Sequence, residues 1–124
     1  MAPMICENDL IVCERVTHRQ VIEEGRIYTY SILGQCYSHR AICVGARRGR
    51  QMWVALRGDN DTHEHIVHPC RIFGQVRYIV RQGQAMPVGV RMQVRTGKYT
   101  KMWFAMKYMW IQLRERLGVR RIAQ

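Results

Sequence analysis

Short apolar stretches, separated by polar turns that contain glycine, run along the first two thirds of the chain. Each stretch is rich in β-branched and aromatic residues, as strands are. The pattern predicts strands at residues 9–16, 26–33, 36–44, 51–57 and 70–81, with a charged hairpin tip at 47–50. Because these strands are short and closely spaced, the fold class predicted is mainly β, an antiparallel domain built of hairpins.

The period of the apolar pattern changes near the C-terminus. On a helix, residues 99–117 place their largest apolar side chains within an arc of about 120°. This apolar stripe consists of Met102, Trp103, Met106, Met109, Trp110, Leu113 and Leu117. Lys107 and Arg114 border it, and Gly118 is suited to end the helix. The stripe is expected either to pack on the β domain, to lie in the interface of an anionic membrane, or to contact a partner protein.

The chain therefore divides into three parts. Residues 1–81 form the predicted β domain, residues 82–98 a linker or loose hairpin, and residues 99–124 the amphipathic helix and a tail. A length of 124 residues is enough for one domain with a modest core. No apolar stretch reaches the roughly 18 residues of a membrane span, and the N-terminal residues do not predict a signal peptide, since they lack a basic region followed by an apolar run. The localisation expected is peripheral to a membrane or cytoplasmic.

The net charge indicates which kinds of partner the protein binds, and the cysteine content indicates the redox state of its compartment. The net charge is +11 and the isoelectric point is near 10.1, which favours polyanions such as nucleic acid or anionic lipid. The chain has five cysteines, an odd number that cannot all pair within the chain, and no two of them form a C-x-x-C motif. They are expected to be small buried thiols of a protein in a reducing compartment.

Three segments carry the candidate chemistry, and they occur in a fixed order. Met1-Ala2-Pro3 is followed by Asn8-Asp9 and an apolar strand, then by His39-Arg40, and then by Gly58-Asp59-Asn60. This order resembles the signal-peptidase-like serine peptidases over residues 1–81. The family has a Ser-Met-x-Pro box, a Gly-Asp before a strand, a base followed by arginine, and a Gly-Asp-Asn box. The base is histidine in one branch of the family, whereas SOS-repressor-type peptidases share the fold but use lysine.

The resemblance implies roles for individual residues. His39 would be the general base, and Asp59 would orient it or stabilise the site. Met1, Pro3 and Ile5 would form a wall of the substrate site. Asp9, Arg40, Gly58 and Asn60 would hold the motifs in shape. The activity implied is endopeptidase cleavage of a peptide or preprotein at small residues near a membrane, on an antiparallel β fold of the signal-peptidase type, with no cofactor.

The nucleophile is the departure from the family pattern. In the family the catalytic serine stands directly before the residue that corresponds to Met1. The sequence contains two serines, Ser31 and Ser38. Ser38 is next to His39, and neighbours on a strand point to opposite faces. Cys6 does not stand at the family position either. Either a longer form supplies the serine or the chain is an inactive relative, and residues 1–124 alone are expected not to hydrolyse peptides.

A second function class stays open beside the peptidase. A non-catalytic basic module would bind nucleic acid, anionic lipid or a protein partner. Nucleic acid is the less favoured ligand, because Trp53 and Tyr78 lie on predicted strands and are expected in the core rather than exposed for base stacking. His63, His65, His68 and Cys70 are metal-ligand types, but their spacing matches no common zinc signature, so a polar loop without metal is predicted.

Overall fold

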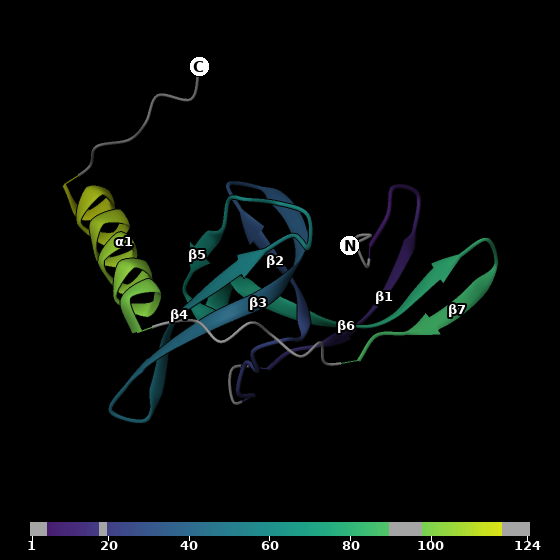
Figure 1. Ribbon diagram of the computed structural model, residues 1–124, viewed down its shortest axis with the longest axis horizontal. Helices are drawn as coiled ribbons and strands as arrows, with labels where there is room; N and C mark the ends of the chain where they lie inside the picture. The colour runs from purple at the N-terminus through teal and green to yellow at the C-terminus, as the bar shows by residue number, and fades with distance from the viewer. Residues whose placement is uncertain (1–4, 18–19, 90–97, 118–124) are drawn as a thin grey trace, which may run out of the picture.

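A computed structural model describes residues 5–17, 20–89 and 98–117, and it consists of one antiparallel sheet and one helix (Figure 1). The mainly β fold with a C-terminal helix, predicted from the sequence, is confirmed. The sheet order is β1-β6-β2-β3-β4-β5, and β7 pairs with β6. The elements are β1 (Leu10–Arg15), β2 (Ile27–Ile32), β3 (Gln35–Arg47), β4 (Arg50–Arg57), β5 (His65–Val67), a 3₁₀ turn (Pro69–Arg71), β6 (Ile72–Arg81), β7 (Gln84–Pro87) and α1 (Lys98–Arg116).

Three of the hairpins turn through the same two-residue geometry. The turns are Leu33-Gly34, Arg48-Gly49 and Gln82-Gly83, and both residues of each have positive φ, between 49° and 79°. Such turns match the right-handed twist of the strands that they join, and glycine adopts their second position without steric cost. The hairpin predicted at residues 47–50 therefore lies where the sequence places it.

The strand predictions were incomplete in two places. β5 lies in a stretch that the sequence analysis treated as a polar loop. β7 lies within residues 82–98, so the part of that segment up to residue 89 is a hairpin with β6 rather than a linker. Residues 90–97 of the same segment lie outside the described residues.

The core occupies both faces of the sheet at β4. Val54 and Leu56 pack with Tyr28 and Tyr30 on one face. Trp53 and Ala55, which alternate with them, pack against α1 on the other face. Because both faces are covered, β4 is a continuous apolar run rather than an alternating one. The prediction that Trp53 belongs to the core is confirmed, since the residue is 6% exposed.

Gly45 on β3 allows Trp53 to lie flat against the sheet. The two residues are paired across β3 and β4. A Cβ atom at position 45 would lie 2.0 Å from the Trp53 ring, far closer than atoms can approach. The glycine therefore admits the indole, which also makes an edge-to-face contact with Phe104 of α1 at a ring-centroid distance of 6.2 Å.

The helix packs through a face that the sequence analysis did not select. Phe104 and Tyr108 are the buried residues of α1, and they pack on β4 and β5. The apolar stripe instead points away from the sheet, with Trp103 59% and Trp110 60% exposed. The expectation that the stripe packs on the β domain is therefore wrong. No helix in the described part of the chain is long and apolar enough to cross a membrane.

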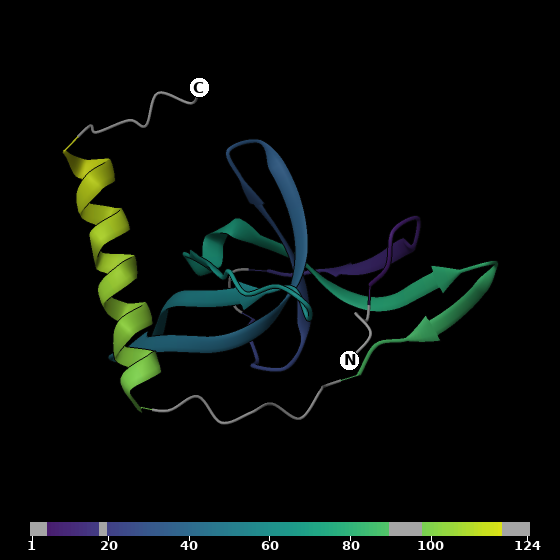
Figure 2. The same ribbon diagram turned by 45° about the horizontal axis from the view of Figure 1, so that its top comes forward.

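The opposite end of the sheet is less covered than expected. Only Cys43 is a buried thiol; Cys6, Cys13, Cys36 and Cys70 are exposed, and none of the five is in a disulfide among the residues described. Tyr78 on β6 is 48% exposed, so its predicted place in the core is also wrong. The prediction that the cysteines are buried is therefore wrong for these four. For Cys13 and Tyr78 the physical reason is that α1 contacts β3, β4 and β5, whereas β1 and β6 lie away from the helix (Figure 2).

Candidate active site

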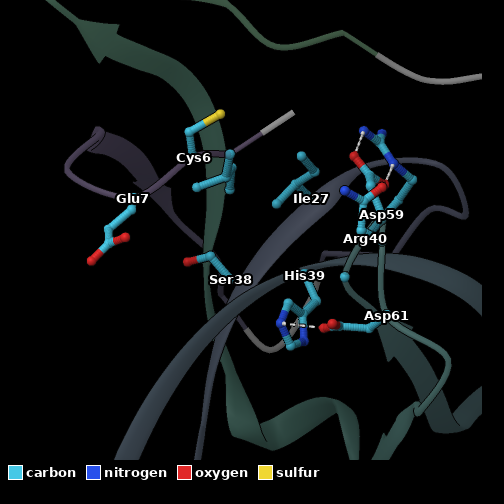
Figure 3. A pocket seen from close by; sticks show the side chains of 11 residues that line it. Cys6, Glu7, Ile27, Ser38, His39, Arg40, Asp59 and Asp61 are labelled. Carbon is cyan, nitrogen blue, oxygen red and sulfur yellow. Dashed lines mark hydrogen bonds and ion pairs between the residues drawn. The ribbon is translucent and has the colours of Figure 1, made fainter. Parts of the chain in front are cut away.

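The motif segments of the N-terminus, β3 and the loop after β4 meet around one pocket of about 360 Å³ (Figure 3). Of the residues proposed from sequence, those that line it are Ile5, His39, Arg40, Gly58, Asp59 and Asn60. Met1 and Pro3 lie outside the described residues. The fold thus gathers segments that are 34 and 19 positions apart in the sequence.

His39 is held at the pocket by a tyrosine hydroxyl. Its Nδ1 lies 2.8 Å from Tyr30 Oη, and the same hydroxyl lies 2.7 Å from Nδ1 of His65 on β5. A phenol has one proton, so while both imidazoles are neutral it donates to one ring and accepts from the other. The tautomers of the two histidines are therefore linked. When Tyr30 donates to His65, His39 donates through Nδ1 and carries its lone pair on Nε2.

The protonation states of this cluster suit a base. Burial lowers the pKa of His39 below its ordinary value, and the neighbouring His65 lowers it further. Burial also lowers the pKa of His65, with Lys107 adding to the effect. Burial raises the pKa of Tyr30 well above that of a free phenol, so the hydroxyl stays protonated. At neutral pH the cluster holds two neutral imidazoles, which is the form that accepts a proton.

Asp59 faces Arg40 rather than lying against the imidazole. Its two oxygens accept hydrogen bonds from Arg40 Nε at 2.8 Å and Nη2 at 3.1 Å. Arg40 also donates from Nη1 to the carbonyl of Gly25 at 2.6 Å. The carboxylate beside His39 is Asp61, whose Oδ2 is 3.8 Å from Nε2. Asp59 thus stabilises the site by fixing the loop, and Asp61, which the sequence analysis did not select, is the acid near the base.

Gly58 makes room for this second carboxylate. A Cβ at position 58 would lie 2.4 Å from Asp61 Oδ2 and 3.4 Å from Cδ2 of His39. The amide of Asp61 donates to the carbonyl of Gly58 at 3.0 Å, which closes a tight turn. Asn60, between them, is exposed and lines the pocket. The glycine of the Gly-Asp-Asn box therefore lets Asp61 fold back toward the imidazole.

Asp9 fixes the N-terminal segment beside the pocket. Its carboxylate accepts from the amide of Cys6 at 2.7 Å and from Nε and Nη2 of Arg81 at 2.9 and 2.7 Å. The hydrogen bonds from Arg81 lower the pKa of Asp9 to about 2. Asn8, at the position where the family has glycine, has φ of 69°, a conformation that asparagine tolerates better than most residues. The segment is thereby tied to β6, and Ile5 packs near Ile27.

No serine, threonine or cysteine among the described residues hydrogen-bonds to His39. Ser38 also lines the pocket (Figure 3), but its Oγ lies 2.9 Å from Thr29 Oγ1, with which it is hydrogen-bonded. Ser31 lines a separate hollow near β5. The sulfur of Cys6 points away from the imidazole in the same view. Among the described residues, the pocket therefore holds a neutral imidazole to which no hydroxyl other than that of Tyr30, and no thiol, is hydrogen-bonded.

Two of the three histidines in the 63–70 segment, His65 and His68, have structural partners. His65 bonds to Tyr30, and Nδ1 of His68 accepts from the amide of Cys70 at 3.1 Å, which caps the 3₁₀ turn. Within the described ranges, no group of three His, Cys, Asp or Glu side chains is arranged to hold a metal ion. The sequence signal that could have placed His65 is the apolar pair that follows it, Ile66-Val67, which marks a short strand.

Comparison of the chain with protein-family models, with curated proteins and with solved structures found no match.

Proposed function

We propose that the pocket around His39 is the base-bearing part of a signal-peptidase-like serine endopeptidase site, on an antiparallel β fold of the same type. The observation that supports the proposal is that Ile5, His39 and the Gly58-Asp59-Asn60 box line one pocket. Each motif is short and common by itself. Their convergence around a partly buried, neutral imidazole is what a serine peptidase requires of its base.

In the proposed reaction a serine hydroxyl gives its proton to Nε2 of His39 as it attacks the peptide carbonyl. The residue before Met1 is five positions from Ile5, a stretch that spans at most about 17 Å, so a serine there is within reach of the pocket. Asp61 stabilises the imidazolium that forms, and Tyr30 keeps the ring oriented through Nδ1. Ile5 and Ile27 give the pocket an apolar side suited to small residues of an extended peptide or preprotein.

The test adds the nucleophile to the protein. The full chain is extended at its N-terminus by a short segment that ends in serine, and a matched form ends in alanine. Both are exposed to a serine-reactive phosphonate ester, and the covalently labelled fraction is followed by mass spectrometry. We expect labelling of the serine form alone, at the added residue. Because a general base contributes about 10² to 10⁴ in rate, His39→Gln should slow labelling at least about 100-fold.

His68→Gln is the matched control, since His68 is an exposed histidine outside the pocket. Its labelling rate should equal that of the serine form. Equal labelling of the serine and alanine forms, or of His39→Gln and His68→Gln, would refute the proposed site and leave the non-catalytic basic binding module as the function to pursue.

A further inference from the structure

The outward face of α1 is apolar along its whole length. Trp103, Met106, Met109 and Trp110 are each between 59% and 69% exposed, and Met102 and Leu113 are about half exposed. Monomeric soluble proteins rarely expose a continuous apolar surface of this extent without a binding role. The face needs an explanation other than packing within the chain.

The outward face of α1 is not the face that packs against the sheet. α1 is attached through the opposite side, where Phe104 and Tyr108 pack on the sheet and Lys107 pairs with Glu64 at 2.8 Å. The inward side of the helix also carries its single acid, Glu115. The outward side therefore combines apolar residues with basic ones and no acid.

Positive charge is concentrated around the same face. The hairpin tip at 47–50 and residues 98–117 together hold eight basic residues and one acid, so they carry seven of the eleven net charges. On the helix, Arg116 borders the stripe on one side and Arg114 borders it on the other.

The hairpin tip and the stripe belong to one end of the molecule. The β3–β4 hairpin ends beside α1 (Figures 1 and 2), and its Arg47 and Met52 line a hollow together with Trp110 and Arg116 of the helix. Arg47 and Met52 of this hairpin line a hollow of about 440 Å³ together with Met102 and Met109 of the helix. An extended flat partner can thus contact the arginines and the apolar stripe at once.

We infer that this face binds the interface of an anionic lipid bilayer, with α1 lying in the plane of the headgroups. Tryptophan is suited to that depth, and basic side chains beside an apolar stripe reach anionic headgroups. The charge distribution decides against a second copy of the chain as the occupant, because two such faces would bring their basic borders together. This inference does not depend on the peptidase proposal.

The test uses the full chain and two vesicle compositions, phosphatidylcholine alone and phosphatidylcholine with about one third phosphatidylglycerol. Binding is measured by co-sedimentation and by quenching of tryptophan fluorescence with brominated lipid. The variant Trp103→Ser/Trp110→Ser removes both exposed indoles and leaves the buried Trp53 as an internal reference. The matched control is Leu10→Ser/Val12→Ser, which removes two exposed apolar side chains of β1, at the far end of the sheet from the helix. Circular dichroism and melting temperature establish that both variants are folded.

We expect the wild type and the control to bind anionic vesicles within twofold of each other, with quenched fluorescence and little binding to phosphatidylcholine alone. The tryptophan variant should bind at least about tenfold more weakly and show no quenching. Raising the salt from 50 to 500 mM should weaken wild-type binding. Equal binding of the two variants, equal binding to both vesicle types, or a lipid-free dimer that the tryptophan variant abolishes would each overturn the inference.

Discussion

Replacing Asp59 by asparagine removes the negative charge that faces Arg40 inside the protein. The side chains of Arg40 and Asp59 are only 4% and 8% exposed, so water cannot take the place of the lost carboxylate. The amide keeps one acceptor oxygen for Nε, at 2.8 Å in the native protein, but turns a donor NH₂ toward Nη2. Arg40 keeps its bond to the carbonyl of Gly25 and remains a buried, unneutralised cation.

The cost follows from these contacts. Removing one partner of a buried ion pair lowers the free energy of unfolding by about 3–5 kcal/mol. Because the asparagine retains one hydrogen bond to Arg40, we expect a loss of about 3 kcal/mol for Asp59→Asn. That is a large share of the roughly 5–15 kcal/mol that holds a domain of this size together. It corresponds to a fall of about 10 °C in melting temperature. The assay is urea unfolding followed by circular dichroism.

Asp61→Asn is the matched control, because it makes the same chemical change two positions along the same loop. The Asp61 side chain is 59% exposed and lies 3.8 Å from His39, so its loss should cost less than about 1 kcal/mol. The double variant Arg40→Met/Asp59→Leu leaves no buried charge and should recover part of the stability that Asp59→Asn loses. The reasoning is refuted if Asp59→Asn and Asp61→Asn unfold at the same urea concentration.

Two further predictions concern the core and the histidine cluster. Gly45→Ala places a methyl group 2.0 Å from the Trp53 ring and should lower the free energy of unfolding by about 1–3 kcal/mol. Gly89→Ala is the control, because the space around Gly89 is open and its substitution should change the free energy of unfolding little. An unchanged urea midpoint for Gly45→Ala would contradict the packing of Trp53 against Gly45. Burial lowers the pKa of His39 and His65 in the folded protein, so below about pH 6.5 the unfolded chain binds more protons than the folded one. Stability is therefore fully present above that pH and is lost as the pH falls from it through the lowered pKa values of the folded protein. The free energy of unfolding of the wild type should therefore fall between pH 7 and 5 more steeply than that of a His39→Gln/His65→Gln variant. If the two proteins lose stability at the same rate over this pH range, the pKa values of the two histidines are not lowered by folding.

Much of the backbone could be predicted because its signals are local. The hairpins at Leu33-Gly34 and Arg48-Gly49 follow from glycine beside alternating β-branched residues, and the helix found at Lys98–Arg116 was predicted at 99–117 from its period. The short strand β5 escaped prediction, since three residues carry too little pattern to stand out from a loop. β7 falls in the segment predicted as a linker or a loose hairpin, and its pairing with β6 is the hairpin alternative.

The candidate site could be predicted in part. His39, Gly58 and Asp59 were selected from their order in the chain, and they line one pocket. The partners of the imidazole were not selected, because Tyr30 and His65 reach it only through strand pairing and curvature of the sheet. Asp59 and Asp61 are both carboxylates in one loop, and nothing in their local sequence tells which of them meets Arg40.

The amino-acid sequence by itself determined the class of fold, the positions of most turns, the helix and the excess of positive charge. Those properties depend on neighbours within a few positions, where steric preference and hydrophobic period act directly. Only the tertiary structure decided that Phe104 and Tyr108, rather than the longer apolar stripe, attach the helix to the sheet. The reason is that a buried face is chosen by the shape of the surface it must fit: the hollow beside Trp53 accepts two aromatic rings, and the remaining apolar face is left to solvent or to a partner.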